Sequence, residues 1–242
     1  MNIETFLTST QITEDDIKDR TVIVIDVFRT STTIVEALSN GARAIVPVPD
    51  MEEAGKVAAN LDPAGYLLGG ERDGSKIEGY HLGNSPFEYD RATVTGKTII
   101  LNTTNGTRTI TQVAAGHSVV IGGFVNAGVV VQYAKERNRD VTIVCSGWKN
   151  RPSLEDTLCA GLFAHELWDG DYPDTSPDAT YMALSLYRRD KSTLARPLNA
   201  SNHARRLKAL GLGKDIDKCI GLDTCPLIPI YRDSRIENLA AA

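Results

Sequence analysis

The sequence predicts an α/β fold, with three α/β/α layers around a largely parallel or mixed sheet. Short apolar runs rich in Val and Ile alternate along the chain with longer segments of helical pattern. The runs are nearly continuous in hydrophobicity, which is typical of strands buried on both faces. Alternation of such strands with helices favours a sheet that is covered by helices on both sides.

Each predicted element rests on a local pattern of this kind. Strands are expected at 21–27, 42–48, 66–69, 97–102, 118–122 and 141–145, with a last one within 219–231. Helices are expected at 32–39, 51–60, 106–115, 127–137, 154–168, 179–189 and 201–210. Asp50 and Ser153 stand where helix N-caps are expected, each with an acidic residue three positions further on.

Two polar segments interrupt the alternation. Residues 71–90 are Gly-rich and too long for a plain connection, so we expect them to be functional. Residues 169–177 have the composition of a loop or linker. We therefore expect a single domain over 1–242, with 169–177 as the one place where it could be subdivided.

Composition and charge exclude several classes of partner. The formal net charge is −5, so a basic face for nucleic acid or for anionic lipid is not expected. The N-terminal segment lacks a signal-peptide pattern, and no apolar run approaches the ~20 residues of a membrane helix. The four cysteines form no C-x-x-C pair, which favours reduced thiols in a cytoplasmic protein. We expect a small anionic substrate, without nucleic-acid or membrane partners, and a homo-oligomer is compatible with the sequence.

Candidate site residues follow the predicted strands, because ligands of parallel α/β sheets bind at the carboxyl ends of the strands. Four strand ends share one inventory: a carboxylate or small hydroxyl residues, often glycine, and an arginine. Arginine binds phosphate, carboxylate or sulfonate through two hydrogen bonds, and N–H groups at helix starts bind anions. The expected substrate-binding residues are Thr30, Ser31, Thr32, Arg72, Asn84, Thr104, Asn105, Gly106, Thr107, Arg108, Cys145, Ser146, Gly147 and Arg151.

Carboxylates beside a bound phosphate are chemically sensible when a divalent cation lies between them. Mg²⁺ takes hard oxygen ligands, commonly one or two carboxylates together with phosphate oxygens of the substrate. The candidate metal ligands are Asp26, Glu71, Glu155 and Asp156, and the candidate catalytic residues are Asp26, Arg29 and Asp156. Each residue alone could equally cap or stabilise a helix N-terminus. Their recurrence at strand ends favours a hydrolase of phosphate esters.

Two alternatives stay open at this level. Cys145 and Arg151 have the Cys-x5-Arg spacing of phosphatases with a thiolate nucleophile, although Glu155 and Asp156 would oppose a thiolate unless a metal intervened. The attacking group is then water, Asp26 or Cys145. A non-catalytic sensor could also bind a phosphate or sulfonate with the same arginines.

Long motifs link the chain to a known family. From about residue 21 to residue 167 it resembles the 2-phosphosulfolactate phosphatase (ComB) family, in IDVFRTSTTIVEALSNGA, LLGGERDGSKIEGYHLGNSPFEY, GKTIILNTTNGTR and VCSGWKNRPSLEDTLCAGL. The resemblance implies a Mg²⁺-dependent enzyme of three-layer α/β/α fold that converts 2-phosphosulfolactate to sulfolactate and phosphate, on the route to coenzyme M. The chain departs from the small or acidic residues expected after Gly147 at Trp148-Lys149-Asn150, which bears on the width of the pocket.

Overall fold

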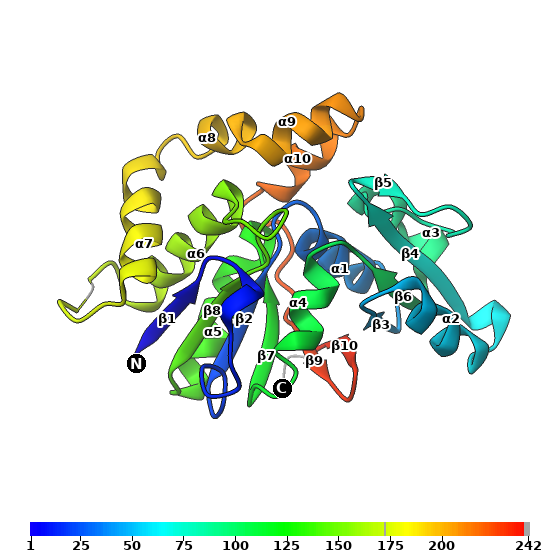
Figure 1. Cartoon of the computed structure of the whole chain (residues 1–242), viewed down its shortest axis with the longest axis horizontal. Helices are drawn as coiled ribbons and strands as arrows, with labels where there is room; N and C mark the ends of the chain where they lie inside the picture. The colour runs from blue at the N-terminus through cyan, green and yellow to red at the C-terminus, as the bar shows by residue number, and fades with distance from the viewer. Residues whose placement is uncertain (172, 240–242) are drawn as a thin grey trace.

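The α/β prediction is confirmed by the computed structural model, which describes residues 1–171 and 173–239. The strands form a ten-stranded mixed sheet flanked by helices (Figure 1), in the order β1-β8-β2-β7-β9-β10-β3-β6-β4-β5. The strands are β1 (Ile3–Phe6), β2 (Thr21–Ile25), β3 (Ala44–Pro47), β4 (Tyr66–Arg72), β5 (Ser75–Lys76), β6 (Thr98–Asn102), β7 (Ser118–Gly122), β8 (Val141–Cys145), β9 (Pro229–Arg232) and β10 (Arg235–Asn238). The α-helices are α1 (Thr30–Ser39), α2 (Met51–Ala59), α3 (Arg91–Val94), α4 (Gly106–Gln112), α5 (Ala127–Arg137), α6 (Leu154–Leu167), α7 (Asp178–Asp190), α8 (Ala195–Ala200), α9 (Asn202–Ala209) and α10 (Gly213–Cys219).

The sheet consists of two parallel blocks joined by an antiparallel hairpin. One block contains β1, β8, β2 and β7, and the other contains β3, β6 and β4. The hairpin of β9 and β10 lies between them, antiparallel to β7 on one side and to β3 on the other. The blocks therefore run in opposite senses. Because strand twist accumulates at roughly 20–25° per step, they are steeply inclined to each other, as β2 and β4 are in Figure 1.

Burial on both faces explains why the apolar runs are continuous. Along β2, Ile23 and Ile25 pack into one hydrophobic cluster, whereas Val22 and Val24 belong to another. The first cluster also takes side chains from α5 and α6, and the second takes side chains from α1 and α4. Successive side chains of a strand point to opposite faces, so a strand covered on both sides needs an apolar residue at every position.

All six strands predicted before residue 150 are present, and the last predicted strand is β9. β4 continues through Glu71 to Arg72, beyond the predicted range of 66–69, so Glu71 is a strand residue. The elements that the sequence did not predict are short: β1, β5, β10, α3, α8 and α10 have two to seven residues each, too few to develop a clear hydrophobic period. Tyr172, within the predicted loop 169–177, lies outside the described residues. No helix of the described residues is long and apolar enough to cross a membrane.

Replacing Ile236 with Ala tests how far the two blocks depend on the hairpin. Ile236 is fully buried on β10 and pairs with Ile45 of β3. We expect Ile236→Ala to lower the free energy of unfolding by about 2–5 kcal/mol, because it removes buried apolar groups and leaves a cavity. Urea denaturation of the wild type and the variant measures this difference.

The matched control is Leu222→Ala, because Leu222 is 58% exposed. This substitution should change stability by less than about 0.5 kcal/mol. Equal effects of the two substitutions would contradict the importance of the hairpin.

Candidate active site

Asp26 is the first residue after β2, and local hydrogen bonds fix its position. Its N–H donates to Ser31 Oγ at 3.0 Å, and the Ser31 N–H donates to the Asp26 carbonyl oxygen at 2.9 Å. These bonds turn the chain from β2 into α1. Gly106 begins α4 beside them, and a Cβ at this position would lie 2.5 Å from Asp26 Oδ2. Only glycine therefore allows the start of α4 to approach Asp26 so closely.

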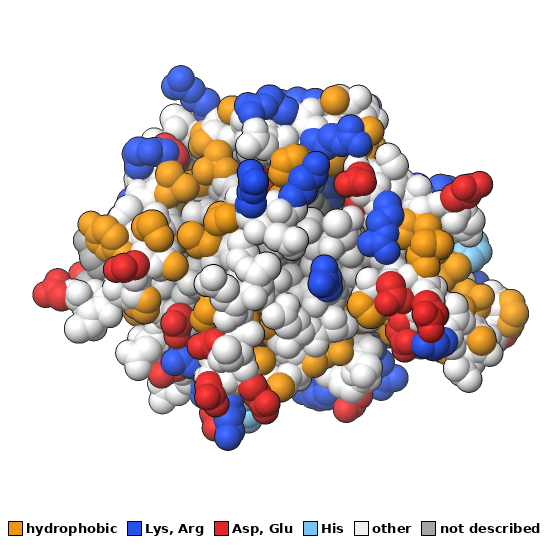
Figure 2. Space-filling view, viewed as in Figure 1, with side chains coloured by type: hydrophobic (Ala, Val, Ile, Leu, Met, Phe, Trp, Pro, Cys, Tyr) orange, Lys and Arg blue, Asp and Glu red, His pale blue; other side chains and the backbone are white. Residues whose placement is uncertain are grey.

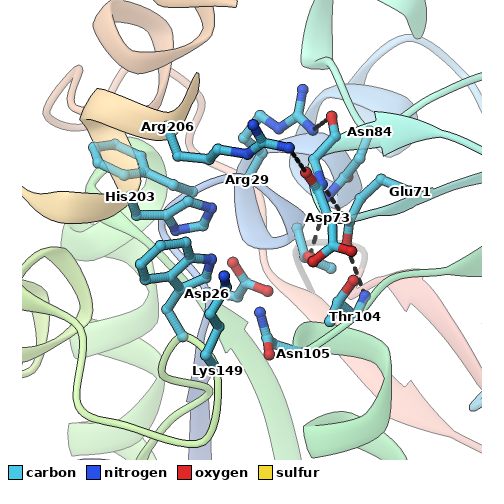
Figure 3. A pocket seen from close by; sticks show the side chains of 14 residues that line it. Asp26, Arg29, Glu71, Asp73, Asn84, Thr104, Asn105, Lys149, His203 and Arg206 are labelled. Carbon is cyan, nitrogen blue, oxygen red and sulfur yellow. Dashed lines mark hydrogen bonds between the residues drawn. The ribbon is translucent and has the colours of Figure 1, made fainter. Parts of the chain in front are cut away.

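Asp26 lines a cavity of about 290 Å³, where the loops that follow β2, β4, β6 and β8 meet α9 (Figure 3). The cavity thus receives residues from both blocks of the sheet. Its lining residues are Asp26, Phe28, Arg29, Thr30, Glu71, Asp73, Gly74, Asn84, Thr104, Asn105, Trp148, Lys149, His203 and Arg206.

Three carboxylates line this cavity, belonging to Asp26, Glu71 and Asp73. Backbone donors hold Glu71 in place: its Oε1 accepts the Thr104 N–H and its Oε2 accepts the Gly74 N–H, both at 2.7 Å. Glu71 therefore links the end of β4 to the loop that follows β6. Each of its oxygens retains a lone pair for a further donor or a cation.

The carboxyl group of Asp26 is in an environment that disfavours its charged form. Only 7% of the residue is exposed, and this burial raises its pKa above the ordinary value. Hydrogen bonding by Thr30 and the charge of His203 lower the pKa, whereas the charge of Glu71 raises it further. A cation beside Asp26 would relieve both the desolvation and the repulsion.

Arg29 lies in the same loop as Asp26 and lines the cavity, but its positive charge is compensated by a residue outside the cavity lining. Its Nη1 donates to Asp215 Oδ2 of α10 at 2.8 Å, and its Nη2 donates to the Gly74 carbonyl oxygen at 2.9 Å. The side chains of both members of this ion pair are only 3% exposed. The second oxygen of Asp215 accepts the Ser85 hydroxyl at 2.7 Å. The pair of Arg29 and Asp215 thus joins the loop after β2 to α10 and to the segments that contain Gly74 and Ser85.

Asp156 is buried and does not line the cavity. Its Oδ1 accepts the Val27 N–H at 2.9 Å, and its Oδ2 accepts the Gly147 N–H at 3.0 Å. Burial raises its pKa well above the ordinary value, and the charges of Asp26 and Glu155 raise it further. This carboxyl group ties the loop after β2 to the loop after β8, and so positions two walls of the cavity.

Glu155 lies next to Asp156 in α6 but contacts a different partner. Its Oε1 lies 3.0 Å from His203 Nδ1 of α9, and the Glu155 side chain is almost completely buried. The His203 ring stacks on Trp148 with a centroid distance of 5.2 Å, and meets the edge of Phe28 at 6.0 Å. The imidazole is therefore held in one orientation, with Nε2 as the ring nitrogen left for the cavity that His203 lines.

Seven of the residues predicted from sequence line the cavity, namely Asp26, Arg29, Thr30, Glu71, Asn84, Thr104 and Asn105. Four are buried in the first turns of α1 and α4, namely Ser31, Thr32, Gly106 and Thr107. Two adjoining cavities contain others: Arg108 and Ser146 line one, and Arg151 and Glu155 line the other. Arg72 is exposed on β4 outside all three cavities, and Gly147 contributes its N–H to Asp156.

Cys145 is fully buried in the hydrophobic core at the end of β8. Burial raises the pKa of its thiol well above the ordinary value, and the charge of Asp156 raises it further. A thiolate nucleophile needs the opposite environment, electropositive and accessible. Because Arg151 lies in an adjoining cavity, the Cys-x5-Arg spacing does not bring its two residues together at the site.

The sequence did not single out several residues of the cavity. His203 and Arg206 come from α9, beyond the motifs at 21–167 in which the family resemblance is close, and their only signal is a basic start to a predicted helix. Trp148 and Lys149 stand out in the sequence only as departures from the family pattern. The others that were missed, Phe28, Asp73 and Gly74, lie within three residues of predicted site residues.

Comparison with known proteins agrees with this arrangement. The model of the family described as 2-phosphosulpholactate phosphatase matches residues 6–234. A probable 2-phosphosulfolactate phosphatase of Caldanaerobacter subterraneus subsp. tengcongensis is 38% identical over 239 residues, covering 98% of each chain. One of Caldicellulosiruptor saccharolyticus is 36% identical over 245 residues, covering 99% of this chain and 100% of the relative. The chain therefore belongs to the 2-phosphosulfolactate phosphatase family.

Proposed function

We propose that this chain is a Mg²⁺-dependent phosphatase that hydrolyses 2-phosphosulfolactate, or a similar small phosphate ester with several negative charges, to sulfolactate and phosphate. The observation that carries the proposal is one cavity that combines the carboxylates of Asp26 and Glu71 with the cationic side chains of Lys149 and Arg206. Carboxylates suit a metal that binds phosphate, and cations suit the remaining anionic groups. We extend the proposal to the pathway implied by the family resemblance, the synthesis of coenzyme M.

The donor set of the cavity fits Mg²⁺. Asp26 is desolvated and close enough to Glu71 for their charges to interact. Two neutral oxygens nearby, Thr104 Oγ1 and Asn84 Oδ1, are buried without a hydrogen-bond partner in the described part of the chain. The described residues hold no group of three or more His, Cys, Asp or Glu side chains suited to a metal, but Mg²⁺ commonly uses only one or two carboxylates. We propose Asp26 and Glu71 as its ligands; when bound, the ion would neutralise charge on the phosphate oxygens.

His203 is positioned to protonate the leaving group. A carboxylate only accepts hydrogen bonds, so Glu155 keeps a proton on His203 Nδ1 and leaves Nε2 to exchange a proton in the cavity. In the proposed reaction the oxygen of water forms a bond to phosphorus while the bond from phosphorus to the ester oxygen breaks. The ester oxygen takes the proton from Nε2, and the proton lost by the water restores His203 in the net reaction.

Asp26→Asn tests the proposed metal ligand. We expect the variant to release phosphate from 2-phosphosulfolactate at least about 10²-fold more slowly than the wild type, because one of the two carboxylates proposed to hold Mg²⁺ is lost. Wild-type activity should likewise disappear in EDTA and return with Mg²⁺. The control is Asp217→Asn on the exposed side of α10. Full activity in EDTA, or tight binding of the substrate without turnover, would overturn the proposal.

The same substitution has an expected effect on stability with a defined pH dependence. The pKa of Asp26 is higher in the folded protein than its ordinary value of 3.8, so ionisation favours the unfolded state as the pH rises above that value. In metal-free buffer, Asp26→Asn should therefore raise Tm at pH 7, and its gain over the wild type should shrink as the pH is lowered toward 4. Thermal unfolding monitored by circular dichroism measures both; a lower Tm at pH 7 would contradict the assigned environment.

His203→Gln tests the proton donor. General-acid catalysis commonly contributes about 10²–10⁴-fold, and the contribution is largest for strongly basic leaving groups. We expect a loss of this size with 2-phosphosulfolactate, whose leaving group is an alkoxide, and a much smaller loss with p-nitrophenyl phosphate, whose leaving group is a weak base. Equal losses with both substrates would indicate that His203 acts only in binding or folding.

A further inference from the structure

We infer that Lys149 and Arg206 form a subsite for a second anionic group of the substrate, separate from its phosphate. The subsite would select esters that carry a sulfonate or carboxylate beside the phosphate. This inference rests on the proposed function, because it assigns the substrate specificity of the same cavity. Its residues differ from the four arginines that the sequence singled out, of which only Arg29 lines the cavity.

The charges of the cavity are unevenly compensated. Arg29 is neutralised by Asp215, with 2.8 Å between Nη1 and Oδ2. Within residues 1–171 and 173–239, neither Lys149 nor Arg206 forms an ion pair. Arg206 Nη2 donates to the carbonyl oxygen of Asp73 at 3.2 Å, and Lys149 Nζ lies 4.9 Å from the centre of the Trp148 ring. Both cations are thus held by neutral groups and keep their charge for a ligand.

The backbone at Lys149 gives independent support. The residues on either side of the Lys149-Asn150 pair bond to each other: the Trp148 N–H donates to the Arg151 carbonyl at 2.9 Å, and the reverse bond measures 3.1 Å. The two central residues have φ values of 54° and 57°. Tight turns with positive φ at both central positions favour Asn and Gly, not Lys. Because lysine is not favoured in this conformation, its presence beside the cavity supports a role for its charge there.

The two cations face the acidic side of the cavity. Figure 3 shows Lys149 and His203 on one side of the cavity and Glu71 and Thr104 on the other, with the guanidinium of Arg206 extending between them. Lys and Arg side chains also gather over the upper part of the molecule in Figure 2, where α8, α9 and α10 lie, although the net charge of the chain is −5. A substrate whose phosphate lies by Asp26 and Glu71 would therefore direct its other anionic groups toward Lys149 and Arg206.

The test compares Lys149→Asn and Arg206→Gln on three substrates: 2-phosphosulfolactate, 2-phospholactate without the sulfonate, and phenyl phosphate without either extra anion. Charged hydrogen bonds contribute enough for about a ten- to hundredfold loss of kcat/KM with 2-phosphosulfolactate, mainly through KM. The loss with phenyl phosphate should stay below about threefold. The matched controls are Arg205→Gln and Lys208→Gln, also on α9 but outside the cavity lining.

A second readout separates binding from folding. Lys149→Asn should leave Tm unchanged or raise it, because Asn suits the positive φ better than Lys. Calorimetric titration with sulfolactate should show weaker binding to both variants than to the wild type, with or without turnover. Equal loss of kcat/KM on all three substrates, or unchanged sulfolactate binding, would overturn the subsite. A wild type that binds sulfolactate through these residues but releases no phosphate would instead refute the proposed function.

Discussion

The buried ion pair between Arg29 and Asp215 is the interaction on which the architecture of the site depends. It joins the loop after β2 to α10, almost two hundred residues further along the chain, and through Gly74 and Ser85 it also fixes the segment between β4 and α3. With both side chains only 3% exposed, loss of either partner would leave a buried charge, which commonly costs about 3–5 kcal/mol. The C-terminal helices are held in this way against the strand ends that carry Asp26 and Glu71.

The carboxylates of the site have different roles. Asp156 is satisfied by two backbone N–H groups and positions loops, and Glu155 orients His203. Burial raises the pKa of both Asp26 and Asp156, but of the two only Asp26 lines the cavity. Stability is thus reduced at the position where a ligand or cation would restore it, which is common at functional sites.

In the described part of the chain, local sequence patterns sufficed for seven of the ten strands and for half of the residues that line the cavity. Buried strands need apolar residues at every position, and the polar residues that follow them, such as Asp26 and Thr104, then mark the ends. Neighbours on a helix face different directions, so nothing local could separate the roles of Glu155 and Asp156. His203 and Arg206 depend on where α9 docks, which is decided by long-range packing and by the ion pair to α10. The four arginines that follow predicted strands illustrate the same limit. Their residue type and position in the sequence did not determine which cavity, if any, each side chain lines.

The central position of the β9–β10 hairpin in the sheet has a consequence for how the protein is made. Within residues 1–171 and 173–239 the hairpin follows every other strand, yet it is the link between the block that carries Asp26 and the block that carries Glu71. During synthesis on the ribosome both blocks emerge before the strands that join them. Until the hairpin is made, β7 and β3 lack the neighbouring strands that they have in the folded sheet. Such unpaired edges can pair with strands of other chains. Assembly of the active site is therefore coupled to synthesis of the β9–β10 hairpin, because a chain interrupted before residue 229 lacks the strands that join the two blocks.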